Sequence, residues 1–115
     1  MANKYDLKIA NIPLLTGVME VGDQVPLGKT RFVCFIKHSA VTGGTVAIGE
    51  GVDADTMTTV KDTTVMEGGG ILAYPDNIDM DNPLFSITPD ADNEKWLVVE
   101  STIDDGTVTV VYFDE

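Results

Sequence analysis

The sequence predicts an all-β protein: a single antiparallel domain of about eight short strands, arranged as a β-sandwich or a barrel. Three observations support this fold class. Short apolar or alternating runs recur along the 115 residues, and Gly, Pro, Asn and Asp interrupt them. Thr, Val, Ile and aromatic residues dominate these runs, as β propensity requires. Eleven glycines and five prolines leave little room for ordinary helices, and the length suits one domain.

The first element is the apolar run LKIANIPLL, residues 7–15, which ends at Thr16-Gly17. Residues 1–15 are interpreted either as an N-terminal arm that lies on a neighbouring molecule or as the first strand of the domain. The sandwich domain then covers residues 16–115. Its predicted strands are 18–21, 30–39, 45–48, 56–66, 71–74, 84–88, 95–102 and 107–113.

Two of these predictions carry local detail. Segment 56–66 is one long strand or two short strands bent at Lys61-Asp62. The last two strands are separated by IDDG, and its Asp105-Gly106 predicts a hairpin between them.

The run TRFVCFIKHS, residues 30–39, is apolar on both faces in its middle. This pattern predicts a central strand that is either covered on both sides within the domain or covered by a neighbouring subunit. Cys34, the single cysteine, is expected to be a buried small hydrophobe. The single histidine, His38, would lie roughly 13 Å farther along the strand, which is too far for a thiol and its base.

The charge balance excludes some partners. Nineteen acidic residues face seven basic ones, for a net charge of −12. Binding to nucleic acid needs clustered Lys and Arg, and an anionic membrane surface would repel this chain. High negative charge favours solubility, although a halophilic source would produce the same composition. We expect no signal peptide and no transmembrane helix.

No catalytic motif is present: there is no GxSxG, HExxH, CxxC or P-loop sequence. One histidine and one cysteine nearly exclude a zinc site. A glycoside hydrolase would need two carboxylates at a defined separation across a cleft. The sequence therefore favours a protein that is not an enzyme and has no cofactor.

Two acidic segments, PDNIDMDNP (75–83) and DADNE (90–94), raise the question of calcium. An EF-hand loop that starts at Asp90 would need Gly at its sixth position, which is Lys95, and Glu at its twelfth, which is Ser101, so that motif is absent. The default interpretation is two solvated turns, the first crossing between the two sheets with Ile78 and Met80 against the core. The calcium candidates are Asp76, Asp79, Asp81, Asp90 and Asp92.

Candidate contact residues come from the apolar N-terminal segment, the long strand and the single tryptophan. Leu97 and Val99 are predicted to lie in the core. Trp96 shares the opposite face with Val98 and Glu100, so it is either an exposed anchor or packed under a loop of its own domain. The interface candidates are Leu7, Ile9, Ile12, Leu14, Leu15, Val33, Phe35 and Trp96.

The order of several segments resembles small structural proteins of phages and viruses. VPLGKTRFVCFIKHS (25–39) is followed by GTVAIG, VMEGGGILAYP, NPLFSI and the closing strand TVTVVYF. Together they are similar to the β-sandwich and jelly-roll modules of head-decoration, capsid-associated and tail-associated subunits. The resemblance covers most of residues 16–113, and the two acidic loops depart from it.

The resemblance implies a single-domain, antiparallel β-sandwich that is jelly-roll-like. It also implies a non-enzymatic virion protein that is made in the host cytoplasm and lies on the capsid surface or the tail. Its implied partners are further copies of itself, often as a trimer, and the major capsid protein or another virion protein. The alternative is a carbohydrate-binding or calcium-assisted, lectin-like sandwich, in which Trp96 or Tyr74 stacks on a sugar.

Overall fold

The computed structural model describes residues 6–40, 43–66, 70–74 and 78–115. All nine strands in this part of the chain pair in antiparallel fashion, and each corresponds to a segment predicted from the sequence. None of the described residues forms a helix that is long and apolar enough to cross a membrane. The strands are β1 Lys8–Pro13, β2 Gly17–Glu20, β3 Arg31–Ala40, β4 Gly44–Gly51, β5 Thr59–Met66, β6 Gly70–Tyr74, β7 Phe85–Ile87, β8 Trp96–Ser101 and β9 Thr107–Asp114.

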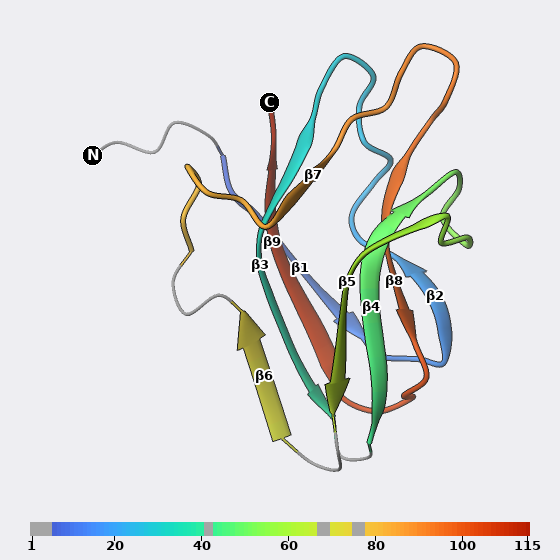
Figure 1. The fold of residues 1–115 in the computed structure, drawn as a ribbon, viewed down its shortest axis with the longest axis vertical. Helices are drawn as coiled ribbons and strands as arrows, with labels where there is room; N and C mark the ends of the chain where they lie inside the picture. Colours follow the sequence, from blue (N-terminus) through green and yellow to red (C-terminus); the bar gives the residue numbers. More distant parts are fainter. Residues whose placement is uncertain (1–5, 41–42, 67–69, 75–77) are drawn as a thin grey trace.

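The strands form two sheets of a sandwich (Figure 1). Sheet A has the order β1-β9-β3-β6, with β7 also paired to β3, and sheet B has the order β2-β8-β4-β5. Four pairs are nested along the chain, β4 with β5, β3 with β6, β2 with β8 and β1 with β9, and successive pairs alternate between the sheets. This arrangement is a jelly roll, in which one long hairpin is rolled into two sheets. The predicted fold class is therefore confirmed.

The core lies between the sheets and follows the period-two pattern of the strands. Each large aliphatic residue buried there contributes roughly 1.5–3 kcal/mol to folding. The strand residues of this core are Val33, Ile36, Val108, Val110 and Tyr112 from sheet A, with Val46, Ile48, Leu97 and Val99 from sheet B. Leu14, Val21, Val25, Ile87 and Ile103 complete it from strand ends and connections.

One extra residue interrupts each sheet. In β3, Val33 pairs with Tyr112 and Phe35 with Val111, so Cys34 is the bulged residue. In β5, Asp62 pairs with Ile48 and Val60 with Gly49, so Lys61 is the bulged residue. Of the two alternatives predicted for residues 56–66, the structure therefore has the single strand, and a β-bulge lies at Lys61 where the bend was placed.

Strand β4 extends three residues beyond its predicted end, through Gly49 and Gly51. The connection that follows folds back closely over these glycines. A Cβ atom on Gly51 would lie 1.7 Å from the carbonyl oxygen of Thr56, and one on Gly49 would lie 2.0 Å from that of Thr59. Glycine therefore extends this strand because only a residue without a side chain admits the returning backbone.

Two predicted connections are wrong. Asp105-Gly106 does not close a hairpin, because β8 lies in sheet B between β2 and β4 while β9 lies in sheet A between β1 and β3. Both edges of each strand are occupied, so the turn, with Gly106 at φ 84°, leads from one sheet to the other. The segment after β6 is not a crossing between sheets either, because β6 and β7 both pair with β3.

Candidate functional site

The outer face of sheet A carries a second apolar layer, on the side opposite the core. Val111 pairs with Phe35 on one side and with Ile9 on the other, and Phe32 stacks on Phe113 with ring centroids 5.1 Å apart. Val111 and Phe113 are nearly fully buried although they point away from sheet B. Burial on both faces, predicted for residues 30–39, is therefore nearly complete on β9, whereas on the outer face of β3 Phe32 and Phe35 are half-buried.

The connection from residue 78 to β7 runs along this outer side of β3 (Figure 1). Burial, and then the nearby carboxylate of Asp79, raise the pKa of the Cys34 thiol. The thiol is 1% exposed, as predicted for a small buried hydrophobe. Ile78 in the same connection is exposed and Met80 is half-buried, so only part of its apolar side is covered.

The N-terminal contact candidates divide into two groups. Residues 8–13 form strand β1 of sheet A, with Ala10 and Ile12 packed against the core and Leu14 inside it. Leu7, Ile9 and Leu15 are exposed, and Ile9 is the most exposed of them at 65%. The exposed aliphatic side chains of this segment are therefore Leu7, Ile9 and Leu15.

The remaining contact candidates are partly or wholly covered. Val33 lies in the core and does not reach the surface. Phe35, on the outer face of sheet A, and Trp96, at the start of β8, are half-buried. Tyr74 ends β6 and pairs through its backbone with Ile36.

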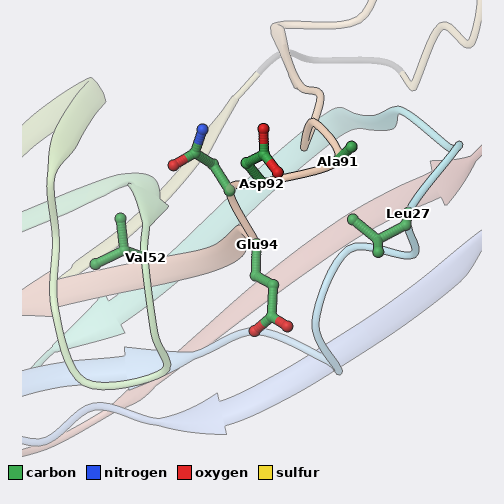
Figure 2. A pocket seen from close by; sticks show the side chains of 6 residues that line it. Leu27, Val52, Ala91, Asp92 and Glu94 are labelled. Carbon is green, nitrogen blue, oxygen red and sulfur yellow. The ribbon is translucent and has the colours of Figure 1, made fainter.

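A shallow depression of about 310 Å³ lies between three connections at one end of the sandwich (Figure 2). Leu27 comes from the β2–β3 connection, Val52 from the β4–β5 connection, and Ala91, Asp92, Asn93 and Glu94 from the β7–β8 connection. In Figure 2, Leu27 and Val52 lie on opposite sides, with the Glu94 carboxylate between them. The sequence reasoning missed this site, although exposed Leu27 between Pro26 and Gly28 marks an apolar loop tip.

The acidic loops use their aspartates to build turns. Asp79 Oδ1 accepts a hydrogen bond from the backbone N–H of Asp81 at 2.9 Å, and its Oδ2 accepts one from Asn82 Nδ2 at 2.8 Å. The hydrogen bond from the Asn82 side chain is the main reason that the pKa of Asp79 lies below its usual value, with that from Asp81 second. Such turns are the default role of Asp and Asn in loops.

The second acidic loop repeats this geometry. Asp90 Oδ1 accepts from the backbone N–H of Asp92 at 3.0 Å and from Asn93 Nδ2 at 2.8 Å, and these bonds lower the pKa of Asp90. Asp76 lies outside the described residues, and Asp81 and Asp92 are exposed. Among the residues that the structure describes, no three His, Cys, Asp or Glu side chains converge to hold a metal ion.

Two ion-pair clusters were also missed, and both lie at the end of the sandwich where the depression is found. Arg31 is 2% exposed and pairs with Asp114, and Glu50 is 8% exposed and pairs with Lys61 and Lys95. Each central residue shares a strand face with core residues, Arg31 with Val33 and Glu50 with Ile48. In the sequence, both clusters could have been recognised from a charged residue that occupies the apolar face of a strand.

Comparison of the chain with protein-family models, with curated proteins and with solved structures finds no match. Its possible function therefore has to be argued from its own surfaces.

Proposed function

We propose that this protein is a non-enzymatic structural subunit that associates with copies of itself. The observation that carries the proposal is the apolar outer side of sheet A, where Ile9 and Leu7 remain exposed beside the buried Val111 and Phe113. Exposed aliphatic residues that continue a buried apolar layer are typical of contact surfaces. Association would cover the rest of this apolar outer side of sheet A, which the chain itself covers only in part.

We further propose a virus particle as the setting, with the protein as a capsid decoration or as a head- or tail-associated subunit. The jelly roll is a recurrent fold of capsid and lectin domains, which makes it compatible with this setting without establishing it. The resemblance of residues 25–39 and of the segments after them points the same way. A net charge of −12 suits the outside of a shell, away from packaged nucleic acid.

Sedimentation of the purified protein between about 1 and 100 µM tests self-association, since contacts of ordinary strength populate oligomers in this range. A mass above 12.3 kDa that rises with concentration is the expected result, and a monomer throughout would contradict the proposal. The flanking genes test the setting independently. Capsid, portal or terminase genes beside this one would support a virion protein, and an unrelated metabolic cluster would contradict it.

The depression in Figure 2 favours one alternative, a carbohydrate-binding sandwich. Leu27 and Val52 offer apolar contact, and Asp92, Asn93 and Glu94 offer hydrogen-bonding groups. This alternative predicts binding on a glycan array that Asp92→Ala abolishes and Glu100→Ala, an exposed substitution on β8, leaves intact. A calcium-assisted mode also predicts a melting temperature that rises in millimolar calcium, and no such rise in Asp92→Asn.

A further inference from the structure

Strand β1 is an edge strand, and the direction of its backbone groups follows from one hydrogen bond. The Leu14 N–H donates to the Gly106 carbonyl at 3.0 Å, just beyond the last pair of β1 with β9. Backbone groups alternate in direction along an antiparallel strand, so residues 8, 10 and 12 also face β9. The N–H and C=O groups of Leu7, Ile9 and Asn11 therefore face away from the sheet. Within the described residues, no strand pairs with this side of β1.

Pro13 limits how another strand can pair here. It belongs to the outward-facing set but has no N–H, so continuous pairing in both directions is available from Leu7 to Asn11. A second β1 centred on Ile9 uses this stretch completely: Ile9 faces Ile9 of the other copy, and Leu7 faces its Asn11. Shifting the centre toward Pro13 would lose a hydrogen bond.

Charge also favours this edge for contact between two copies. The chain carries nineteen acidic residues, yet Lys8 is the single charged residue between Leu7 and Met19. The nearest acid along the chain, Asp6, precedes the stretch that would pair. Contact through the loop end would instead bring Asp92 and Glu94 near the same residues of another copy. Like charges that face each other oppose association, so the electrostatic cost is smaller at β1 than at the loop end.

The edges of sheet B are poorer candidates. Strand β2 has four residues and carries Glu20, and β5 is interrupted by the bulge at Lys61. Short edge strands, edge charges and bulges all disfavour pairing between molecules.

We propose that two copies of this protein join through antiparallel pairing of β1, with the two-fold axis at Ile9. Sheet A then continues from one molecule into the next. The two Ile9 side chains lie beside each other on its outer face, each next to its own Val111. This inference rests on the proposed self-association and specifies its surface. Such a contact uses the same residues on both copies and closes with two, unlike the trimer that the resemblance implies.

Asn11→Pro tests the pairing directly. It removes an N–H that faces away from β9, so the bonds between β1 and β9 remain while pairing with the second copy is lost. Asn11→Ala is the matched control, because it also loses the bond from Thr109 Oγ1 to Asn11 Oδ1 but keeps the N–H. Sedimentation should give a mass of twice 12.3 kDa for the unmodified protein and for Asn11→Ala. Dimerisation should be at least about tenfold weaker in Asn11→Pro.

Ile9→Lys should weaken dimerisation similarly, because it places two cations side by side at the axis. Val60→Lys is its control, since Val60 is an exposed aliphatic residue on the edge strand of sheet B, and it should leave the dimer unchanged. Circular dichroism of each variant should confirm that it is folded.

A chemical cross-link tests the register. Opposed Cβ atoms in a hydrogen-bonded antiparallel pair lie about 5.5 Å apart, which is too far for an unstrained disulfide but is spanned by a short bis-maleimide cross-linker. Ile9→Cys should therefore give a covalent dimer with such a cross-linker. Leu15→Cys, an exposed site beyond the pairing stretch, should not, and the buried Cys34 can remain in place.

The outcomes separate this inference from the proposed function. A dimer that survives both Asn11→Pro and Ile9→Lys, or a trimer, would overturn β1 pairing and leave self-association standing, for example through β6 at the other edge of sheet A. An unmodified protein that stays monomeric at about 100 µM would overturn both. A weakened dimer in both variants, with an intact dimer in both controls, supports the inference.

Discussion

The two ion-pair clusters lie at the same end of the sandwich, one in each sheet, but the buried residue is a cation in one and an anion in the other. In sheet A the cation is buried: Arg31 Nε and Nη2 donate to the two oxygens of Asp114 at 2.8 and 3.0 Å. Its Nη1 donates to the Asp23 carbonyl at 2.7 Å, and its guanidinium carbon lies 4.4 Å from the Tyr112 ring centroid. In sheet B the anion is buried: Glu50 contacts Lys95 Nζ at 2.5 Å and Lys61 Nζ at 3.3 Å.

The difference follows from the chemistry of the two cations. A guanidinium has several N–H groups in a fixed plane, so a carboxylate, a carbonyl and a ring can together replace its water. An ammonium is a strongly hydrated point charge, and Lys61 and Lys95 remain 30% and 29% exposed. Sheet B therefore buries the carboxylate and keeps its cations in contact with water.

The β2–β3 connection links the two clusters. Asp23 accepts from Arg31, and the Val25 N–H donates to the Lys95 carbonyl at 2.9 Å. Leu27, in the same connection, lines the depression of Figure 2. The conformation of the loops at this end consequently depends on both clusters. The loss in the free energy of unfolding that substitutions in each cluster cause shows which cluster contributes more to stability.

Arg31→Met should have the largest effect, a loss of about 3–5 kcal/mol in the free energy of unfolding, because it leaves buried acceptors without their donor. Asp114→Asn should also destabilise the protein, since it leaves a buried cation without its counter-charge. Urea unfolding measures both. Lys29→Met, at an exposed cation two residues earlier, should change stability by less than about 0.5 kcal/mol. Equal effects of Arg31→Met and Lys29→Met would show that the buried pair is not a major contributor.

Glu50→Gln should cost less, about 1–3 kcal/mol, because it removes charged hydrogen bonds but frees two lysines that already reach water. Glu100→Gln on β8 is the control, since Glu100 is exposed, and it should be nearly neutral. Thermal or urea unfolding of the two variants, Glu50→Gln and Glu100→Gln, measures the difference in their stability. A loss as large as that of Arg31→Met would contradict the ranking.

The free energy of unfolding should fall with decreasing pH in two separate pH ranges. In each range the slope for one proton is at most about 1.4 kcal/mol per pH unit. Burial lowers the pKa of His38 below its ordinary 6.5, so the unfolded chain takes up the proton first and stability falls as pH drops below 6.5. Burial raises the pKa of Glu50, but hydrogen bonds and charge from Lys95 and Lys61 outweigh it, and the pKa lies below 4.5. The stability contributed by Glu50 is therefore lost as pH falls from about 4.5 through its folded pKa.

Unfolding measured from pH 8 to 3 checks both ranges. His38→Leu should remove most of the pH dependence of stability just below pH 6.5. The difference in the free energy of unfolding between the unmodified protein and Glu50→Gln should shrink below about pH 4.5. A difference that stays constant from pH 6 to 3 would contradict the role assigned to the Glu50 carboxylate.

Lys61→Met and Lys95→Met should have the smallest effects, each up to about 1 kcal/mol, because half-exposed cations retain much of their hydration. Lys95→Met should exceed Lys61→Met, since Lys95 makes the shorter contact with Glu50. The double substitution should cost more than the two single losses added together, because only then is Glu50 buried without a cation. Simple additivity, measured by urea unfolding, would argue against a shared carboxylate.

The sequence predicted every strand in the described part of the chain, because strands depend on local patterns, and it marked Lys61-Asp62 as an irregular point of β5. It also placed Leu97 and Val99 in the core. The sequence did not distinguish exposed from buried residues among the contact candidates: Ile9 is exposed, while Leu14 and Val33 are buried. Period-two alternation distinguishes the faces of a strand, but it does not say which face meets the other sheet when both are apolar.

What the sequence alone determined was therefore the set of strands, the positions at which they end and the acidic character of the chain, all of which follow from neighbouring residues. Only the tertiary structure decided which strands pair, that Asp105-Gly106 joins two sheets, and that Arg31 meets Asp114 across 83 positions. Pairing between distant strands depends on loop closure and on competition for a limited number of strand edges. Those are properties of the whole chain, and no local pattern records them.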